Sequence, residues 1–555
     1  MGAGGFGCGS EPDRPKYTGE EDAAPAGRRV NRGDTVALSS IDLAIVAAYA
    51  VFIFVLAQWV SREKKDHRKD AQDYFLASRA LPWWAIGTSL IAANISAEQI
   101  IGMSGSGYVI GLAIASYEWM AAITLIIVGK YFIPIFLRNR IYTMPEFLER
   151  RYNPAVRTTM AVFWLGVYIF INLTAILWLG ATAVHTVTGM DVQVALVAIG
   201  VFAGAYALYG GLKAVALTDI VQVTLLVFGG LVISYIALDR ISDGAGVIAG
   251  FQRLTIELPE KFDMILAADN PNYKDLPGLS VLLGGMWVMN VSYWGFNQYI
   301  IQRALGAKSI REAQKGIVLA AFLKLLMPVI IVLPGIAAVV LAPALARPDE
   351  AYPHLMAMLP AGVLGLVFAA LIAAIVASLG SKINSIATIF TMDLYRAARP
   401  KAGTEKLVVV GRIAAVVSLL IAIASARPLL GSFDQAFQYI QEFTGFFTPG
   451  ICVIFLLGMF WERATSLGAI TAAIGSAVLS FALKMLWPEL PFMDRVGVVF
   501  LACIAIAVVL SLLQKPDGKA LRVELRDIDY STSPGFNVSA LIVAAILVAL
   551  YAWWW

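Results

Sequence analysis

Long apolar runs recur along the whole chain and are separated by short polar segments. About fourteen of them approach the roughly 20 residues that an α-helix needs to cross a bilayer. The runs do not alternate polar and apolar positions, as the strands of a membrane β-barrel would. The pattern therefore predicts an all-α polytopic membrane protein. The predicted spans lie near residues 40–60, 82–108, 113–136, 158–185, 192–209, 215–237, 281–300, 316–343, 362–393, 407–427, 436–458, 464–486, 495–513 and 535–555.

The second predicted span carries unusually many polar residues and glycines. Its segment IAANISAEQIIGMSG (91–105) places Glu98 and Gln99 at bilayer depth, followed by Gly102 and Gly105. Glycine weakens a helix by about 1 kcal/mol relative to alanine, so we expect a broken helix, although the glycines alone would also suit close helix packing. Unwound backbone persists in a membrane only against protein or a water-filled cavity, where its carbonyls can bind a cation.

The seventh predicted span repeats this pattern in MWVMNVSYWGFNQY (286–299), which contains Asn290 and Tyr293. Interrupted spans at corresponding positions of two halves indicate an inverted-repeat transporter. We therefore expect two repeats, at roughly residues 82–237 and 281–458.

Composition and charge fit a membrane protein and suggest its orientation. The chain is 59% hydrophobic and 14% charged, whereas soluble domains are nearer 45–50% and 25%. Five loops rich in lysine and arginine follow odd-numbered spans, which predicts that these loops are cytoplasmic and that both termini lie outside. Residues 1–38 are predicted to be a disordered tail, and residues 39–555 a single transmembrane domain. The sequence has no G-x-x-x-x-G-K-[ST] phosphate loop, which argues against an ATP-driven pump.

Several ionisable residues fall inside predicted spans, among them Glu118, Asp219 and Lys324. Such a group costs roughly 2.5–3.5 kcal/mol at the centre of a membrane helix, so each is expected to face a cavity or a partner. Glu118 and Lys324 could pair with one another, or they could hold a polyol between an acceptor and a donor. Asp219 and Lys324 could also extend to an interface.

Two further spans offer candidate ligands. The ninth contains Ala374 and Ser378 among many small residues, which suits either an oxygen cage for a hard cation or simple close packing. The eleventh begins with QAFQYIQE (435–442), where Phe437 and Gln441 combine a ring with an amide. Rings and amides together suit a sugar, but they would equally suit an extracellular helix end.

Several segments closely resemble the sodium/solute symporter family, in particular its sodium–glucose and sodium–galactose cotransporter branch. These segments are DYFLASRALPWWAIGTSLIAANISAEQIIGMSGSGY, YEWMAAITLIIVGKYFIPIF, YWGFNQYIIQRAL, EAQKGIVLAAFLK and QAFQYIQE. The resemblance covers roughly residues 40–555. It implies a LeuT-type fold of two inverted five-helix repeats plus flanking helices. It also implies alternating access, with sodium and a monosaccharide carried together across the plasma membrane.

The resemblance also implies roles for individual residues. Tyr293 would be the inner gate under the sugar, hydrogen-bonded by Asn94, and Asp219 would lie on the ion's exit path. The implied sugar contacts are Gln99, Glu118, Asn290, Lys324 and Gln441. The implied outer cover consists of Met103, Tyr117 and Phe437. The implied sodium ligands are the backbone carbonyls of Ala92, Ile95 and Ala374 and the hydroxyl of Ser378.

Two positions depart from the family pattern. The sodium site commonly has two adjacent hydroxyl residues, and here Ala377 precedes Ser378. A serine of the sugar site is replaced by Ala121, which removes a hydrogen bond worth about 1 kcal/mol. A symporter of another polyol such as inositol therefore stays open, as does an uncoupled sugar uniporter or sensor. An enzyme is not expected, because no nucleophile–base motif accompanies the charged residues.

Overall fold

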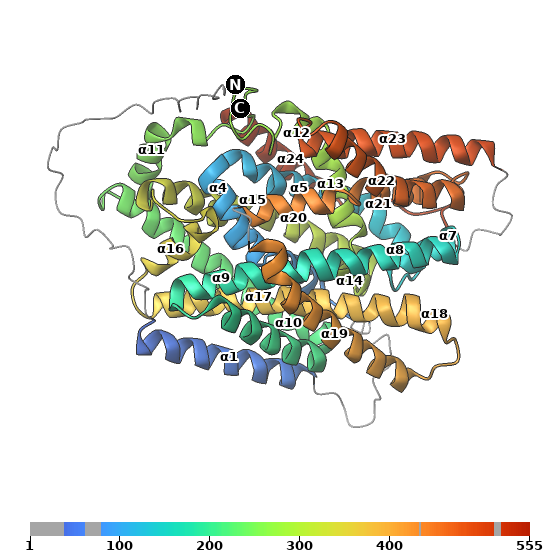
Figure 1. The fold of residues 1–555 in the computed structure, drawn as a ribbon, viewed down its shortest axis with the longest axis horizontal. Coiled ribbons are helices and arrows are strands. Elements are labelled where there is room, and N and C mark those ends of the chain that lie inside the picture. The colour runs from blue at the N-terminus through green and yellow to red at the C-terminus, as the bar shows by residue number, and fades with distance from the viewer. Residues whose placement is uncertain (1–37, 62–78, 432–434, 515–522) are drawn as a thin grey trace, which may run out of the picture. The chain divides into compact units, whose positions relative to one another are not determined.

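The computed structural model describes residues 38–61, 79–431, 435–514 and 523–555, without the side chains of 54, 57–61 and 206–219. In these ranges the chain is built from helices, as predicted, and Figure 1 shows long ones such as α1 (Ser40–Ser61) and α17 (Val363–Ile389) running in a common direction. The predicted tail at 1–38 lies outside the described residues except for its last residue.

Among the described residues, nine helices are long and apolar enough to cross a membrane. A tenth is added if α20 (Ala436–Gly445) and α21 (Thr448–Phe460), bent by 48° at their junction, form one span. This criterion supports a multi-pass helical membrane protein but does not reach the fourteen spans expected. The nine are Leu112–Arg138, Pro154–Thr188, Ile220–Ile241, α15 (Ile310–Leu341), Val363–Ala398, α19 (Thr404–Leu430), α22 (Ser466–Leu486), α23 (Phe492–Leu513) and α24 (Pro534–Trp553).

Three of these spans contain π-helical turns. The first consists of η3 (Leu112–Ala115), α5 (Ser116–Ile127), the π-turn η4 (Val128–Phe132) and α6 (Ile133–Arg138). The second consists of α8 (Pro154–Val167), the π-turn η5 (Tyr168–Leu173) and α9 (Thr174–Thr188). The third continues α17 with the π-turn η8 (Phe390–Tyr395) and α18 (Arg396–Ala398). Short helices outside the spans and outside the two broken segments are α7 (Met144–Arg151), α11 (Val247–Glu257), η6 (Pro259–Lys261), η7 (Pro348–Glu350) and α16 (Ala351–Ala357).

The two spans expected at 192–209 and 215–237 fall in one helix, α10 (Val192–Ile241). Fifty helical residues would extend about 75 Å at 1.5 Å per residue, more than twice the roughly 30 Å of a bilayer core. Only Val192–Ala205 and Ile220–Ile241 are described with their side chains, and these two ends correspond to the two predicted spans.

The second predicted span is broken, as expected, but not at its glycines. Helix α3 (Trp83–Asn94) ends where Ile95 is extended (φ −70°, ψ 110°), and the π-turn η2 (Glu98–Gly102) and α4 (Met103–Ile110) follow. The glycines lie in helical turns packed against neighbours, because a Cβ on Gly105 would lie 2.6 Å from the Asp349 carboxylate. The packing interpretation therefore accounts for the glycines, and the break comes before them.

The seventh predicted span is also broken. Helices α12 (Leu279–Leu283) and α13 (Gly285–Phe296) precede an extended Asn297 (φ −77°, ψ 122°), after which α14 (Gln298–Leu305) begins. The start of α3 lies beside the end of α14, because the Leu81 N–H donates to the Gly306 carbonyl at 3.0 Å. The Trp83 N–H donates in turn to Glu312, at 2.8 Å. The two broken spans therefore run in opposite directions, as inverted repeats require.

Loops that follow odd-numbered predicted spans contact one another. The Arg151 guanidinium donates to the Gly458 carbonyl in the last turn of α21 and to the Trp461 carbonyl just after it, both at 2.8 Å. The Thr143 hydroxyl donates to Asp393 at the end of the ninth span (3.0 Å), and the Glu524 N–H donates to Asn139 (2.7 Å). These contacts gather the predicted cytoplasmic loops on one side of the protein.

Candidate functional site

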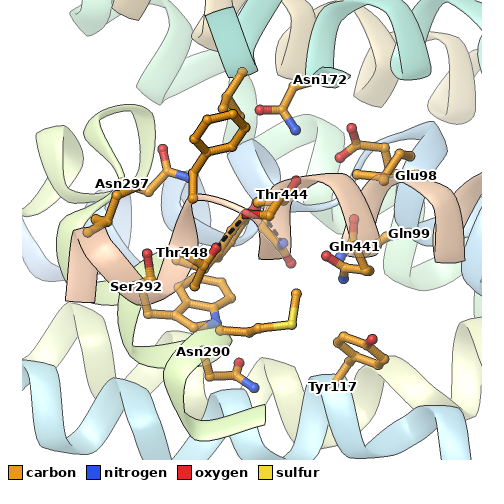
Figure 2. A pocket seen from close by; sticks show the side chains of 18 of the residues that line it. Glu98, Gln99, Tyr117, Asn172, Asn290, Ser292, Asn297, Gln441, Thr444 and Thr448 are labelled. Atoms are coloured by element: carbon orange, nitrogen blue, oxygen red, sulfur yellow. Dashed lines mark hydrogen bonds between the residues drawn. The ribbon is translucent and has the colours of Figure 1, made fainter. Parts of the chain in front are cut away.

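A polar cavity lies between the two broken spans, α5, η5, α15 and α20, and its lining is shown in Figure 2. It contains about 960 Å³ of non-protein space, counting its open side. Nearly all residues that the resemblance assigned to the substrate site and its gate line this cavity. They are Asn94, Gln99, Tyr117, Glu118, Asn290, Tyr293, Lys324, Phe437 and Gln441. Met103 is fully buried and is not part of the lining.

Glu118 and Lys324 form a buried ion pair at the cavity wall. The Lys324 ammonium donates to the Glu118 carboxylate and to the Asn94 side-chain oxygen, and it lies 4.9 Å from the centre of the Trp294 ring. Only 1% of Lys324 is exposed, so it does not extend to an interface. The predicted pairing is therefore present, and the same groups face the cavity, where a hydroxyl-bearing ligand could join the network.

Tyr293 is fixed from two sides. Its hydroxyl accepts hydrogen bonds from the Asn94 amide (3.0 Å) and from the Tyr299 hydroxyl (2.6 Å). The contact expected between Asn94 and Tyr293 is thus present, while the gating role of Tyr293 stays a prediction. Elsewhere in the lining, Tyr117 and Phe437 meet edge to face with ring centres 5.1 Å apart. This geometry is compatible with the predicted aromatic cover.

Amide side chains dominate the rest of the lining. In Figure 2, Gln99, Gln441 and Asn290 point into the cavity. Asn290 also donates to the Met286 carbonyl one turn earlier, at 3.2 Å. Each primary amide offers two donors and a carbonyl acceptor, so the three together can satisfy several hydroxyl groups. The cavity is thus suited to a small, uncharged, polyhydroxylated molecule.

Sequence reasoning missed part of the lining. The additional polar residues are Glu98, Asn172, Ser292, Asn297, Thr444 and Thr448. Asn172 is the only amide in a long apolar run and lies in the π-turn η5; π-turns frequently occur at functional sites. A lone amide within an apolar span was therefore the available signal.

The residues expected to bind sodium lie around a second, small cavity. Ala92, Ile95 and Ala374 line it, together with Gln222, Val223 and Leu226. Because α3 ends at Asn94, its last carbonyls lack helical partners and are available to a cation. Ser378 is not in this lining, but its hydroxyl donates to the Ala93 carbonyl of α3 at 3.4 Å. Asp219, expected on the ion's exit path, lies outside the residues whose side chains are described.

Gln222 and Lys382 are two residues near this region that sequence reasoning overlooked. The Gln222 amide is buried, and neither its oxygen nor its nitrogen has a hydrogen-bond partner among the described residues. The Lys382 ammonium is fully buried and donates to the Ser378 hydroxyl at 3.0 Å. Lys382 is a charged residue and Gln222 an amide within a predicted span, so the signal that identified Lys324 would have found them as well.

Two broken, oppositely directed spans around a buried polar cavity define a membrane carrier for a small solute. Comparison with known proteins gives the family. The sequence model of the sodium:solute symporter family matches residues 74–475, and the chain belongs to this family. A sodium/glucose cotransporter of Vibrio parahaemolyticus is 50% identical over 539 residues, covering 93% of this chain and 99% of that protein.

A more distant relative and a solved structure are also similar to this chain. A sodium/myo-inositol cotransporter of Sus scrofa is 31% identical, covering 86% of this chain and 74% of its own length. The solved structure of a Na⁺-coupled sialic acid symporter superposes with a TM-score of 0.75 at 23% identity, covering 86% of this chain and 99% of that one. This last similarity establishes a shared fold.

Proposed function

We propose that the protein is a sodium-coupled symporter that carries a monosaccharide of the galactose or glucose type across the plasma membrane by alternating access. The observation that carries this proposal is the cavity in which the Glu118–Lys324 pair and three amides face aromatic rings. The rings can cover the apolar C–H faces of a sugar while the polar groups bind its hydroxyls. The 50% identity to a sodium/glucose cotransporter supports the same substrate class.

Sodium would bind at the end of α3, using the carbonyls of Ala92 and Ile95 with groups of α17 (the Ala374 carbonyl and the Ser378 hydroxyl). The Gln222 amide oxygen from α10 faces the same cavity and would supply a further oxygen where Ala377 cannot. A cation bound there would tie the broken span to α17 and hold the outward-open form until sugar binds. Loss of sodium to the cytoplasm would then free α3 to move.

The membrane potential gives this coupling its driving force. One positive charge that crosses a 100 mV potential releases about 2.3 kcal/mol. Because 1.4 kcal/mol corresponds to a factor of ten, one sodium ion per sugar supports roughly fiftyfold accumulation from the potential alone. A sodium gradient would add to this.

The finer architecture belongs to the same proposal. We place two inverted five-helix repeats of a LeuT-type fold at roughly 82–237 and 281–458, within about fourteen spans, and both termini outside. Two observations support this arrangement. The broken spans run in opposite directions, and the loops expected in the cytoplasm contact one another.

Two alternatives rest on specific observations. Another polyol such as inositol is favoured by Ala121 in the sugar site and by the similarity to sodium/myo-inositol cotransporters. An uncoupled uniporter or sensor is favoured by Ala377, which leaves the predicted sodium site one hydroxyl short. Enzymatic activity is not part of the proposal, since the family is one of transporters.

The test is uptake of radiolabelled galactose, glucose and myo-inositol into proteoliposomes, with and without an inward sodium gradient. Sodium-dependent accumulation above equilibrium is expected for one of the hexoses, and Gln99→Ala should abolish it. Preference for myo-inositol would select the first alternative, and sodium-independent equilibration the second. Lys315→Met serves as a control, because Lys315 is an exposed lysine of α15 far along the helix from Lys324.

A further inference from the structure

Lys382 is a buried cation placed against the predicted sodium site. Its side chain is 0% exposed, and its ammonium donates to the Ser378 hydroxyl at 3.0 Å. That hydroxyl is the only side-chain oxygen that the resemblance assigns to sodium, because position 377 is an alanine. One oxygen is therefore shared between a tethered ammonium and the ion that the protein is proposed to carry.

The surroundings of Lys382 offer it a second partner. The Glu98 carboxylate lies 4.0 Å away, and one oxygen of this carboxylate is buried with no hydrogen-bond partner among the described residues. The Tyr299 ring lies beneath the ammonium, with its centre at 4.4 Å. Arg303, on the same helix as Tyr299, carries a second positive charge but directs it to Ser89, Ser381 and the Tyr299 carbonyl.

Sodium at Ser378 and the ammonium at its present position are electrostatically incompatible. Both would contact the same oxygen, so two full positive charges would lie a few ångströms apart in a buried site, where water screens them little. Moving the ammonium from Ser378 towards Glu98 relieves this repulsion and completes an ion pair that is only loosely formed. A short rotation of a flexible lysine side chain suffices, since the carboxylate is already within 4.0 Å.

We infer that Lys382 acts as a tethered competitor of sodium: it occupies the Ser378 hydroxyl in the absence of sodium and transfers to Glu98 when the ion binds. This inference rests on the proposed sodium site. It also links the two cavities, because Glu98 lines the substrate cavity, where Figure 2 shows it facing Asn172. Sodium binding would thus change the charge environment of a residue that the sugar meets.

The test is the sodium dependence of thermal stability in detergent, measured without sugar. A ligand that binds only the folded protein raises its melting temperature with concentration, and choline replaces sodium as the reference. Lys382→Met keeps an unbranched side chain, one atom shorter, and removes the charge. It should lower the half-saturating sodium concentration on the order of tenfold, because the repelling charge is gone. Lys382→Arg keeps the charge and should remain close to the parent protein, as should the exposed-site control Lys315→Met.

A second variant separates loss of folding from loss of sodium binding. Lys382→Met leaves Glu98 without its counter-charge, whereas Lys382→Met combined with Glu98→Gln removes both charges and should still bind sodium more tightly than the parent protein, because the repelling ammonium is gone. A parent protein without a sodium response, together with a clear response in these variants, would also support the inference. Unchanged or weaker sodium binding in both variants would overturn it. The melting assay contains no sugar, so a failed sugar assignment would appear only in the uptake experiment.

Discussion

The surroundings of Lys324 and those of Lys382 show two ways of burying a lysine in a membrane protein. Lys324 donates directly to a carboxylate and to an amide, so its charge is compensated at contact distance. Lys382 donates to a hydroxyl, and its nearest carboxylate is 4.0 Å away. A buried charge requires a partner. The surroundings of Lys324 offer its ammonium one position, in contact with Glu118 and Asn94, whereas those of Lys382 offer two, at Ser378 and at Glu98. The substrate cavity is thus built around a static charge pair, and the sodium region around a charge that can move.

The largest effect is expected from breaking the static pair. Lys324→Met should reduce sugar uptake at least a hundredfold, because removing one partner of a buried ion pair costs about 3–5 kcal/mol and leaves Glu118 uncompensated. Uptake into proteoliposomes and the melting temperature check this together. Lys324→Met combined with Glu118→Gln should recover much of the stability without recovering uptake. Normal uptake by this double variant would mean that the pair serves the fold and not the sugar.

A smaller effect is expected when the sodium region loses its hydroxyl. Ser378→Ala should raise the half-saturating sodium concentration for uptake about tenfold, because the ion loses one coordinating oxygen, a loss we set at about 1.5 kcal/mol, the size of a hydrogen bond to a charged group. The reverse change, Ala377→Ser, should lower this concentration by restoring a second hydroxyl. Sodium titrations of initial uptake rates measure both. If Ser378→Ala has no effect on the sodium dependence, the ion does not bind at this hydroxyl.

The effects of Gln222→Leu on sodium binding and on thermal stability distinguish two roles for Gln222. If its amide oxygen binds sodium, Gln222→Leu should raise the half-saturating sodium concentration about fivefold, the equivalent of one ordinary hydrogen bond. If the amide has no ligand, the same variant removes an unsatisfied buried polar group and should simply raise the melting temperature. Sodium titration and thermal unfolding of a single preparation separate the two cases.

The smallest effect is expected at Tyr293. Tyr293→Phe removes the hydroxyl that accepts from Asn94 and Tyr299 but keeps the ring, so the sugar KM should rise only about threefold. Tyr293→Ala also removes the ring and should cost considerably more, because stacking area is lost. Concentration series of uptake at saturating sodium compare the two variants. Equal losses in both would assign the role to the hydroxyl and not to the ring.

Hydropathy and polar residues at bilayer depth allowed the helical membrane class and both broken spans to be predicted, because a charge or amide there requires a partner. Most residues of the candidate substrate cavity were assigned by the family resemblance. The residues alone did not locate the break of the second span, since glycine marks both flexibility and close contact, and Gly105 proved to be a contact with Asp349. Gln222 and Lys382 could have been identified as polar or charged residues within spans, but their closeness to the predicted sodium ligands depends on which spans lie side by side, and periodicity within one helix carries no information about that. Met103 was placed by resemblance alone, and it is buried but not part of the cavity lining.

The contact between Leu81 and Ala307 has a mechanical consequence. It fastens the first residues of one broken helix to the last residues of the other, and Glu312 reinforces the fastening at Trp83. The two broken spans are therefore held together at one end, and each is interrupted midway by an extended residue, Ile95 in one span and Asn297 in the other. Because these ends are held together, the two spans cannot slide past one another. The motion left to them is bending at the two breaks. Each break lies beside one of the two cavities, so the places where the spans can bend are the places proposed for the transported solutes.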